Sequence, residues 1–175
     1  MALVPAPEPF PDRDRWDAVN CSVARTLELV GARSTLLILR EAFFGTRRFD
    51  DFRRRVGITE PIAAARLREL VDAGLLARRP YQDPGRRTRQ EYVLTDKGRD
   101  LFPVLIALMY WGDRHLADPA GPPVRVWHDG CGAALHAEVR CAEDHPVPLR
   151  ESRVSAGPGA LPSPRPGPPG AATSP

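Results

Sequence analysis

The chain has 175 residues with a formal net charge of +3, and 42% of its residues are hydrophobic and 27% charged. These values are ordinary for a soluble globular protein and leave room for one domain with appendages. No apolar run approaches the roughly 18 residues needed to cross a bilayer. The first ten residues contain three prolines and no basic segment, which argues against a secretory signal. The three cysteines are too few and too scattered for a disulfide framework, so we expect a reducing, cytoplasmic environment.

The charge is unevenly distributed. Between Cys21 and Arg99 there are 17 Lys and Arg residues against 10 Asp and Glu, a balance of +7, so the rest of the chain carries −4. A basic middle section indicates a polyanionic partner, although a solvated basic surface would have the same composition.

Composition divides the chain into four parts. Residues 1–20 contain four prolines and are expected to form an N-terminal arm, followed by a folded domain over 21–117. Residues 118–150 form a small C-terminal extension. Residues 151–175 are rich in Pro and Gly and are expected to be disordered, because they cannot bury enough apolar area to offset the entropy of ordering.

The folded domain begins with two expected helices. Asn20 can cap the first, which Gly31 ends and whose apolar stripe consists of Val23, Leu27 and Val30. The second covers the nearly continuous apolar run from Thr35 to Phe44 and is stopped by Gly45.

Two further helices follow with a short turn between them. Phe49, Phe52 and Val56 recur at helical spacing, and Gly57 ends that helix. Thr59 is the expected N-cap of the next, with Glu60 and Pro61 in the favoured first-turn positions. Gly74 ends it, and its expected buried stripe is Ala63, Leu67, Leu70 and Val71. Two short helices joined in this way predict a helix-turn-helix.

A hairpin is predicted directly after this helix pair. Leu75–Tyr81 and Gln90–Leu94 are strand-like, and Pro84-Gly85 makes a turn between them. Such a hairpin is a wing, and its tip carries Arg86, Arg87 and Arg89. Arginines there suit either DNA phosphates or a narrow minor groove.

The last helix of the domain is expected to run from Thr95, its cap, to about Leu116. Its LFPVLIALMYW stretch is apolar almost all round, which is more than one buried face can use. The surplus indicates that a helix from a second subunit covers it. Pro103 is expected to kink this helix.

Taken together, these segments resemble the HxlR-type winged helix-turn-helix transcriptional regulators of bacteria. The matching pieces are CSVARTLELVGARSTLLILREAFFG, RRFDDFRRRVGIT, ARLRELVDAGLLARRPY and EYVLTDKGRDLFPVLIALMYWG, which cover about 95 of the 175 residues. Tyr92 to Gly98 follows a pattern shared with other winged-helix regulators, whereas Cys21 and the Trp111-Gly112 helix end favour HxlR.

The resemblance implies a mainly α-helical fold with a small β-hairpin wing and a long C-terminal dimerisation helix. It also implies a homodimer that binds a palindromic or near-palindromic DNA operator, as a repressor or an activator, without enzymatic activity. One departure is the segment Gly31-Ala32-Arg33-Ser34, where the family usually has a Trp after the glycine-basic pair. We expect this departure to affect local packing rather than DNA binding.

The amino-terminal half of the helix at about 59–73 is expected to enter the major groove. Its flanks and outer face carry Pro61, Ile62, Ala65, Arg66 and Arg68. Arg66 is the main candidate for reading a base, with a phosphate contact as the alternative, whereas Ile62 and Ala65 can contact thymine methyl groups. Thr59 is expected to cap the helix, at a terminus that can also hold a phosphate.

Backbone contacts are expected from two other places. Arg53, Arg54 and Arg55 can position the DNA backbone, although plain solvation explains each of them equally well. The wing arginines, at about 82–89, are expected to contact the backbone or the minor groove.

Cys21 is a candidate redox sensor. It lies in the first turn of its helix, where the helix dipole and Arg25 would both favour the thiolate. The resemblance adds that some members of the family use a cysteine here as a redox or electrophile switch. A small buried cysteine at a helix start is the alternative, and a switch would need an intersubunit disulfide or a small-molecule adduct.

A zinc site is a further hypothesis from the sequence. His128 with Cys131 and Cys141 with His145 are close pairs of residue types that bind zinc. Related proteins often have a Cys-x-x-Cys in this region, whereas here Asp144 occupies the second position. We therefore expect a degraded site without bound metal, or a small strand pair.

No enzyme motif is evident. The chain has no nucleophile elbow, phosphate loop or HExxH sequence, so no cofactor is expected. Two alternatives to a simple DNA-binding regulator remain: a thiol- or metal-switched form of it, and a winged-helix module that binds proteins without DNA.

Overall fold

The computed structural model describes residues 3–5, 18–82, 84–85 and 87–160. The chain divides into two compact units, one formed by Leu29–Glu138 and the other by the segments on either side of it. Most of the tail that the sequence predicts to be disordered, 161–175, lies outside the described residues, whereas 151–160 includes a short strand.

The central unit contains the predicted helix-turn-helix. Its helices are α2 (Arg33–Phe43), α3 (Phe49–Val56) and α4 (Glu60–Asp72), all within two residues of the predicted bounds. Gly57 follows α3 in a left-handed conformation, with φ of 71°. At the end of α4 the Gly74 N–H bonds the Val71 carbonyl and the Leu75 N–H bonds the Leu70 carbonyl, each at 2.9 Å. This double closure is a Schellman motif, which requires the positive φ that glycine adopts without strain.

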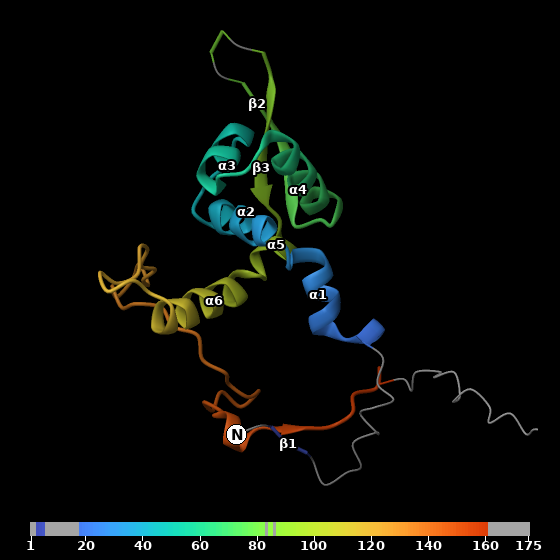
Figure 1. The fold of residues 1–175 in the computed structure, drawn as a ribbon, viewed down its shortest axis with the longest axis vertical. Helices are drawn as coiled ribbons and strands as arrows, with labels where there is room; N and C mark the ends of the chain where they lie inside the picture. The colour runs from blue at the N-terminus through green and yellow to red at the C-terminus, as the bar shows by residue number, and fades with distance from the viewer. Residues whose placement is uncertain (1–2, 6–17, 83, 86, 161–175) are drawn as a thin grey trace, which may run out of the picture. The chain divides into compact units, whose positions relative to one another are not determined.

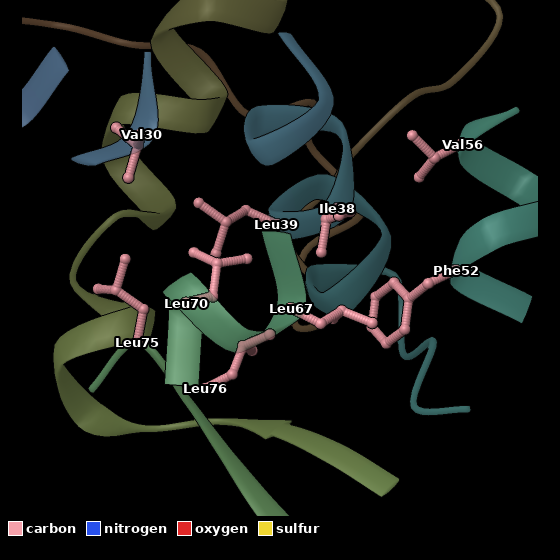
Figure 2. Packing of buried hydrophobic residues seen from close by; sticks show 9 residues of the cluster. All are labelled: Val30, Ile38, Leu39, Phe52, Val56, Leu67, Leu70, Leu75 and Leu76. Carbon is pink, nitrogen blue, oxygen red and sulfur yellow. The ribbon is translucent and has the colours of Figure 1, made fainter. Parts of the chain in front are cut away.

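The three helices share one hydrophobic core. Ile38 of α2, Phe52 of α3 and Leu67 of α4 are completely buried and converge in its centre (Figure 2). The Phe52 ring also meets Tyr92 edge to face, with 6.2 Å between ring centroids. Burial of such side chains contributes about 1.5–3 kcal/mol each, so this cluster holds the helix pair in a fixed orientation.

The predicted wing is present as an antiparallel hairpin. Strand β2 (Leu76–Tyr81) pairs with β3 (Arg89–Leu94), in a register that places Leu76 opposite Leu94. The Tyr92 N–H donates to the Arg47 carbonyl at 2.8 Å, which attaches the hairpin to the loop between α2 and α3. The hairpin extends past α3 and α4 (Figure 1).

The prediction of a single long helix after Thr95 is wrong. The structure has a short α5 (Asp96–Arg99) and a separate α6 (Phe102–His115), with Pro103 in the first turn of α6. Proline lacks an N–H and its ring clashes with the carbonyl four residues earlier, so a helix starts at this position more easily than it continues. Thr95 does cap α5, because its side-chain oxygen accepts from the Gly98 N–H at 3.1 Å.

The first helix also differs from its prediction. Helix α1 (Ser22–Val30) follows a 3-10 turn, η2 (Ala18–Asn20), so Asn20 is not directly before it. The Asn20 amide instead donates to the Gly159 carbonyl at 2.8 Å. Of the expected apolar stripe only Val30 is buried, whereas Val23 and Leu27 are exposed.

The remaining described segments contain little regular structure. The unit formed by the two terminal segments includes the parallel strands β1 (Val4–Pro5) and β4 (Arg153–Val154) and the 3-10 helix η3 (Leu149–Glu151). The expected strand pair of the extension is reduced to isolated bridges between Trp127 and Ala134 and between Arg140 and Pro146. Among the described residues no helix is long and apolar enough to span a membrane.

Gly98 lies where a side chain cannot be accommodated. A Cβ atom there would be 2.1 Å from the backbone oxygen of Leu75, whereas one at Gly112 would meet nothing within 4 Å. We expect Gly98→Ala to lower the free energy of unfolding by about 2–3 kcal/mol, because the backbone must move. Gly112→Ala, as control, should raise it by up to about 1 kcal/mol through helix propensity. Chemical denaturation of both variants measures this, and equal stabilities would contradict the close approach.

Candidate nucleic-acid interface

The outer face of α4 presents most of the predicted contact residues. Burial of Ala63, Leu67 and Leu70 turns the opposite side of the helix to solvent, as the sequence predicts. The expected stripe residue Val71 is half-buried. Of the candidate residues, those that are exposed are Thr59, Pro61, Ile62 and Arg68, and those that are half-buried are Ala65 and Arg66.

Thr59 occupies the N-cap position of α4, as predicted, but its hydroxyl makes no capping hydrogen bond. Its backbone carbonyl accepts from the Ala63 N–H at 2.9 Å, and its extended backbone begins the helix. The cap is therefore made by backbone geometry together with Pro61 in the first turn.

Arg66 is held in place on the helix surface. Its Nη1 lies 2.6 Å from Oε2 of Glu69, one turn further along α4. Its Nε is buried without a hydrogen-bond partner in the described structure. An arginine held in this way is pre-oriented, and its remaining guanidinium N–H groups can donate to a new acceptor. The sequence places the two residues one turn apart, but pairing depends on rotamers that only the packed helix selects.

The arginines of α3 have different surroundings. Arg53 and Arg54 are exposed, and Nη2 of Arg54 lies 2.5 Å from Oδ1 of Asp51. Arg55 is exposed too, but its Nη1 donates to the Thr46 hydroxyl at 2.7 Å. This contact gives Arg55 a structural role at the start of the helix-turn-helix, while Arg53 and Arg54 face solvent.

Sequence reasoning missed a buried carboxylate beneath this helix pair. Glu41 of α2 accepts from Arg40 at 2.8 Å and from the Thr46 hydroxyl at 3.1 Å, and Arg55 lies 4.0 Å away. A buried carboxylate needs such partners to offset its desolvation. The only signal in the sequence is one charged pair, Arg40-Glu41, inside an apolar run.

The hairpin presents more arginines than the sequence predicts. Arg87 and Arg89 are exposed, as expected, whereas Arg86 lies outside the described residues. Arg78 and Arg79 of β2 are exposed as well. Strand alternation would turn one of these two inward, which is why the pattern did not identify both. The Arg48 guanidinium lies 4.8 Å from the centre of the Tyr81 ring, so it adds positive charge beside the end of β2 that leads to the hairpin tip.

The predicted redox and metal residues contact residues near them in the sequence. Cys21 is half-buried directly before α1, and its carbonyl accepts from the Arg25 N–H at 3.0 Å. His128 Nδ1 lies 3.2 Å from Cys131 Sγ, and Cys141 Sγ lies 3.7 Å from His145 Nδ1. Within the described parts of the chain, no group of three or more His, Cys, Asp and Glu residues could hold a metal ion.

Solved structures with a similar fold are known. The chain matches the proposed transcription factor PA1607 with a TM-score of 0.71 and 37% identity, over 79% of this chain and 96% of that one. The proposed transcription factor PA1374 from Pseudomonas aeruginosa matches with a TM-score of 0.55 and 39% identity, over 81% and 95%. These neighbours support a winged-helix fold.

Comparisons of sequence also identify helix-turn-helix transcriptional regulators. An uncharacterised helix-turn-helix transcriptional regulator of Mycobacterium tuberculosis is 49% identical over 144 residues, which is 79% of this chain and 87% of the relative. The family model for the HxlR-like helix-turn-helix matches residues 29–119. The match includes α2, α3, α4, the hairpin and α6, and the chain belongs to the HxlR-like helix-turn-helix family of transcriptional regulators.

Proposed function

We propose that this chain is a sequence-specific DNA-binding regulator that acts in the cytoplasm as a homodimer and has no enzymatic activity. Helix α4 lies in the major groove of the operator, and the arginines of the hairpin contact the DNA backbone or the minor groove. We propose that the protein is a repressor, because a bound dimer blocks access to the DNA that it covers.

One observation carries the DNA-binding proposal. The same burial that places Ala63, Leu67 and Leu70 in the core leaves the start of α4 exposed, at Glu60, Pro61 and Ile62. A helix of a winged helix-turn-helix that is exposed in this way can place side chains against base edges. The arginines of α3 and the hairpin supply the positive charge that phosphates require.

The homodimer is supported by the apolar surface of α6. Val104, Leu108 and Trp111 recur at helical spacing and are 46%, 50% and 58% exposed. An apolar stripe of this kind on one helix is a typical subunit interface. Val23 and Leu27 give α1 a second exposed apolar stripe, which was expected to be buried.

The decisive experiment is fluorescence anisotropy of the full-length protein with the DNA upstream of its own gene and with a scrambled duplex, over a series of salt concentrations. We expect binding to the upstream DNA to be about a thousandfold tighter, with a steep salt dependence. Equally weak binding to both duplexes at every salt concentration would favour a protein-interaction module.

Arg66→Ala tests base recognition. The substitution removes the side chain that is oriented on α4, so operator affinity should fall about 5- to 100-fold while affinity for scrambled DNA changes little. Arg114→Ala, in the last turn of α6, is the control and should leave both affinities unchanged. Comparable losses on both duplexes for Arg66→Ala would assign this arginine to a phosphate instead.

The wing is tested by changing Arg86, Arg87 and Arg89 together to Ala. Removal of these guanidinium groups should weaken binding to operator and scrambled DNA by similar factors. The salt slope should fall by about 1 for each phosphate that the wing no longer neutralises. The control changes Arg114, Arg150 and Arg153 to Ala, which removes the same charge elsewhere. If the control lowers the slope as much, the effect belongs to overall charge and not to the wing.

Leu108→Asp tests the dimer. A carboxylate in the centre of the α6 stripe should convert the dimer to a monomer, because an unpaired charge would be buried in the interface. Leu149→Asp provides a matched control, since both leucines are 50% exposed. Sedimentation velocity distinguishes the two states. A Leu108→Asp variant that remains a dimer would place the interface elsewhere.

A thiol-switched form of the same regulator is the second candidate. The oxidised form of the redox regulator HypR matches the chain with a TM-score of 0.50 and 30% identity, over 56% of this chain and all of that one. Cys21 is a half-buried free cysteine at the start of α1. Oxidant should change operator affinity in the native protein and not in Cys21→Ser. An unchanged response in Cys21→Ser would assign Cys21 a purely structural role.

A further inference from the structure

The central unit contains an apolar cavity of about 270 Å³. It lies between the end of α2, one face of α6 and the extended segment at 124–127. Its walls are mainly aromatic and aliphatic and include Phe43, Phe102, Leu105, Ile106, Met109 and Trp127. Apolar concave surfaces of roughly this volume are typical of small-molecule sites.

The walls combine buried aliphatic groups with more exposed aromatic ones, since Phe102 is 37% and Trp127 61% exposed. The rings of Phe43 and Phe102 lie 5.5 Å apart at 45°, and Leu105 and Ile106 are buried. The 124–127 segment is held by the hydrogen bond from the Leu135 N–H to the Val126 carbonyl at 2.9 Å. The cavity is therefore bounded on opposite sides by helix and by anchored backbone.

The cavity is distinct from the proposed dimer surface. Its residues on α6, Phe102, Leu105, Ile106 and Met109, have helical spacing and occupy one side of the helix. The exposed stripe, Val104, Leu108 and Trp111, is turned by roughly 140° from them at about 100° per residue. A second copy seated on that stripe leaves the cavity side of α6 available.

The chemistry of the rim indicates the kind of ligand. Arg125 is the one charged residue among those that line the cavity, it is exposed, and no acidic residue is among them. An apolar cavity with a single cationic group selects an amphipathic anion, which buries its ring and keeps its charge beside the guanidinium.

We propose that this cavity binds a small aromatic organic acid, with its ring between the phenylalanine pair and Trp127 and its carboxylate at Arg125. A bound acid touches both α2, which shares the core of the helix-turn-helix, and α6, which carries the proposed dimer surface. It is therefore placed to alter how the two recognition helices of a dimer are spaced. Only this regulatory consequence rests on the proposed DNA-binding function.

The test is calorimetric titration of the full-length protein with 1-naphthoate and with its uncharged analogue, 1-naphthamide. For a ligand of this size we expect a Kd for naphthoate between about 10 µM and 1 mM. Because the rim charge is solvent-exposed, naphthamide should bind about fivefold more weakly. If the ring of the ligand lies in the cavity, Met109→Trp should weaken the binding of both ligands, because the larger side chain fills the space.

Substitutions of two exposed arginines test the contact between the ligand carboxylate and Arg125. Arg125→Gln should reduce naphthoate affinity to the level of naphthamide, whereas Arg114→Gln, on an exposed arginine of α6, should have no effect. Three results would each overturn the proposal: no binding of naphthoate, equal affinity for naphthoate and naphthamide, or an unchanged naphthoate affinity in Arg125→Gln. Fluorescence anisotropy with operator DNA separates this proposal from the proposed DNA-binding function. A protein that binds naphthoate but not DNA would contradict only the DNA-binding function.

Discussion

The arrangement of this domain depends on the contact between the end of α4 and the start of α5. The Leu75 carbonyl accepts from the Thr95 N–H at 3.1 Å and lies where a side chain on Gly98 would otherwise be. The Thr95 hydroxyl donates to the Gly74 carbonyl at 2.6 Å, and the Lys97 ammonium donates to the Ala73 carbonyl at 2.8 Å. Carbonyls at a helix end need such partners, and here residues on the far side of the hairpin supply them. One junction thus positions α4, the hairpin and the chain that leads to α6.

The arginines on α3 and α4 differ in whether they are paired with a carboxylate. Arg53 and Arg68 are exposed, whereas Arg54 and Arg66 are paired with carboxylates of their own helices. Exposed ion pairs contribute about 1 kcal/mol or less, so a phosphate or a base can displace them at small cost. Such pairing keeps the arginines ordered and reduces non-specific attraction to any polyanion.

Helix α6 is apolar on two sides. One side closes the core with Leu105 and Ile106 and continues into the cavity, while the other exposes Leu108 and Trp111. A helix with a single buried face would not need this composition. The apolar surplus that is visible in the sequence therefore corresponds to two surfaces, for which we propose a ligand site and a subunit interface.

The sequence by itself determined the local elements, because their signals are local: glycines such as Gly57 and Gly74 end helices by their backbone freedom, and helical spacing of apolar residues marks the buried faces. Only the tertiary structure decided which apolar stripe is covered, where the expected long helix divides before Pro103, and which arginine pairs with a carboxylate. Each of these depends on neighbours distant in sequence or on a choice among rotamers of similar energy. Buried Glu41 shows the limit most clearly, since a lone acid in an apolar run identifies neither Thr46 nor Arg55 as its partners.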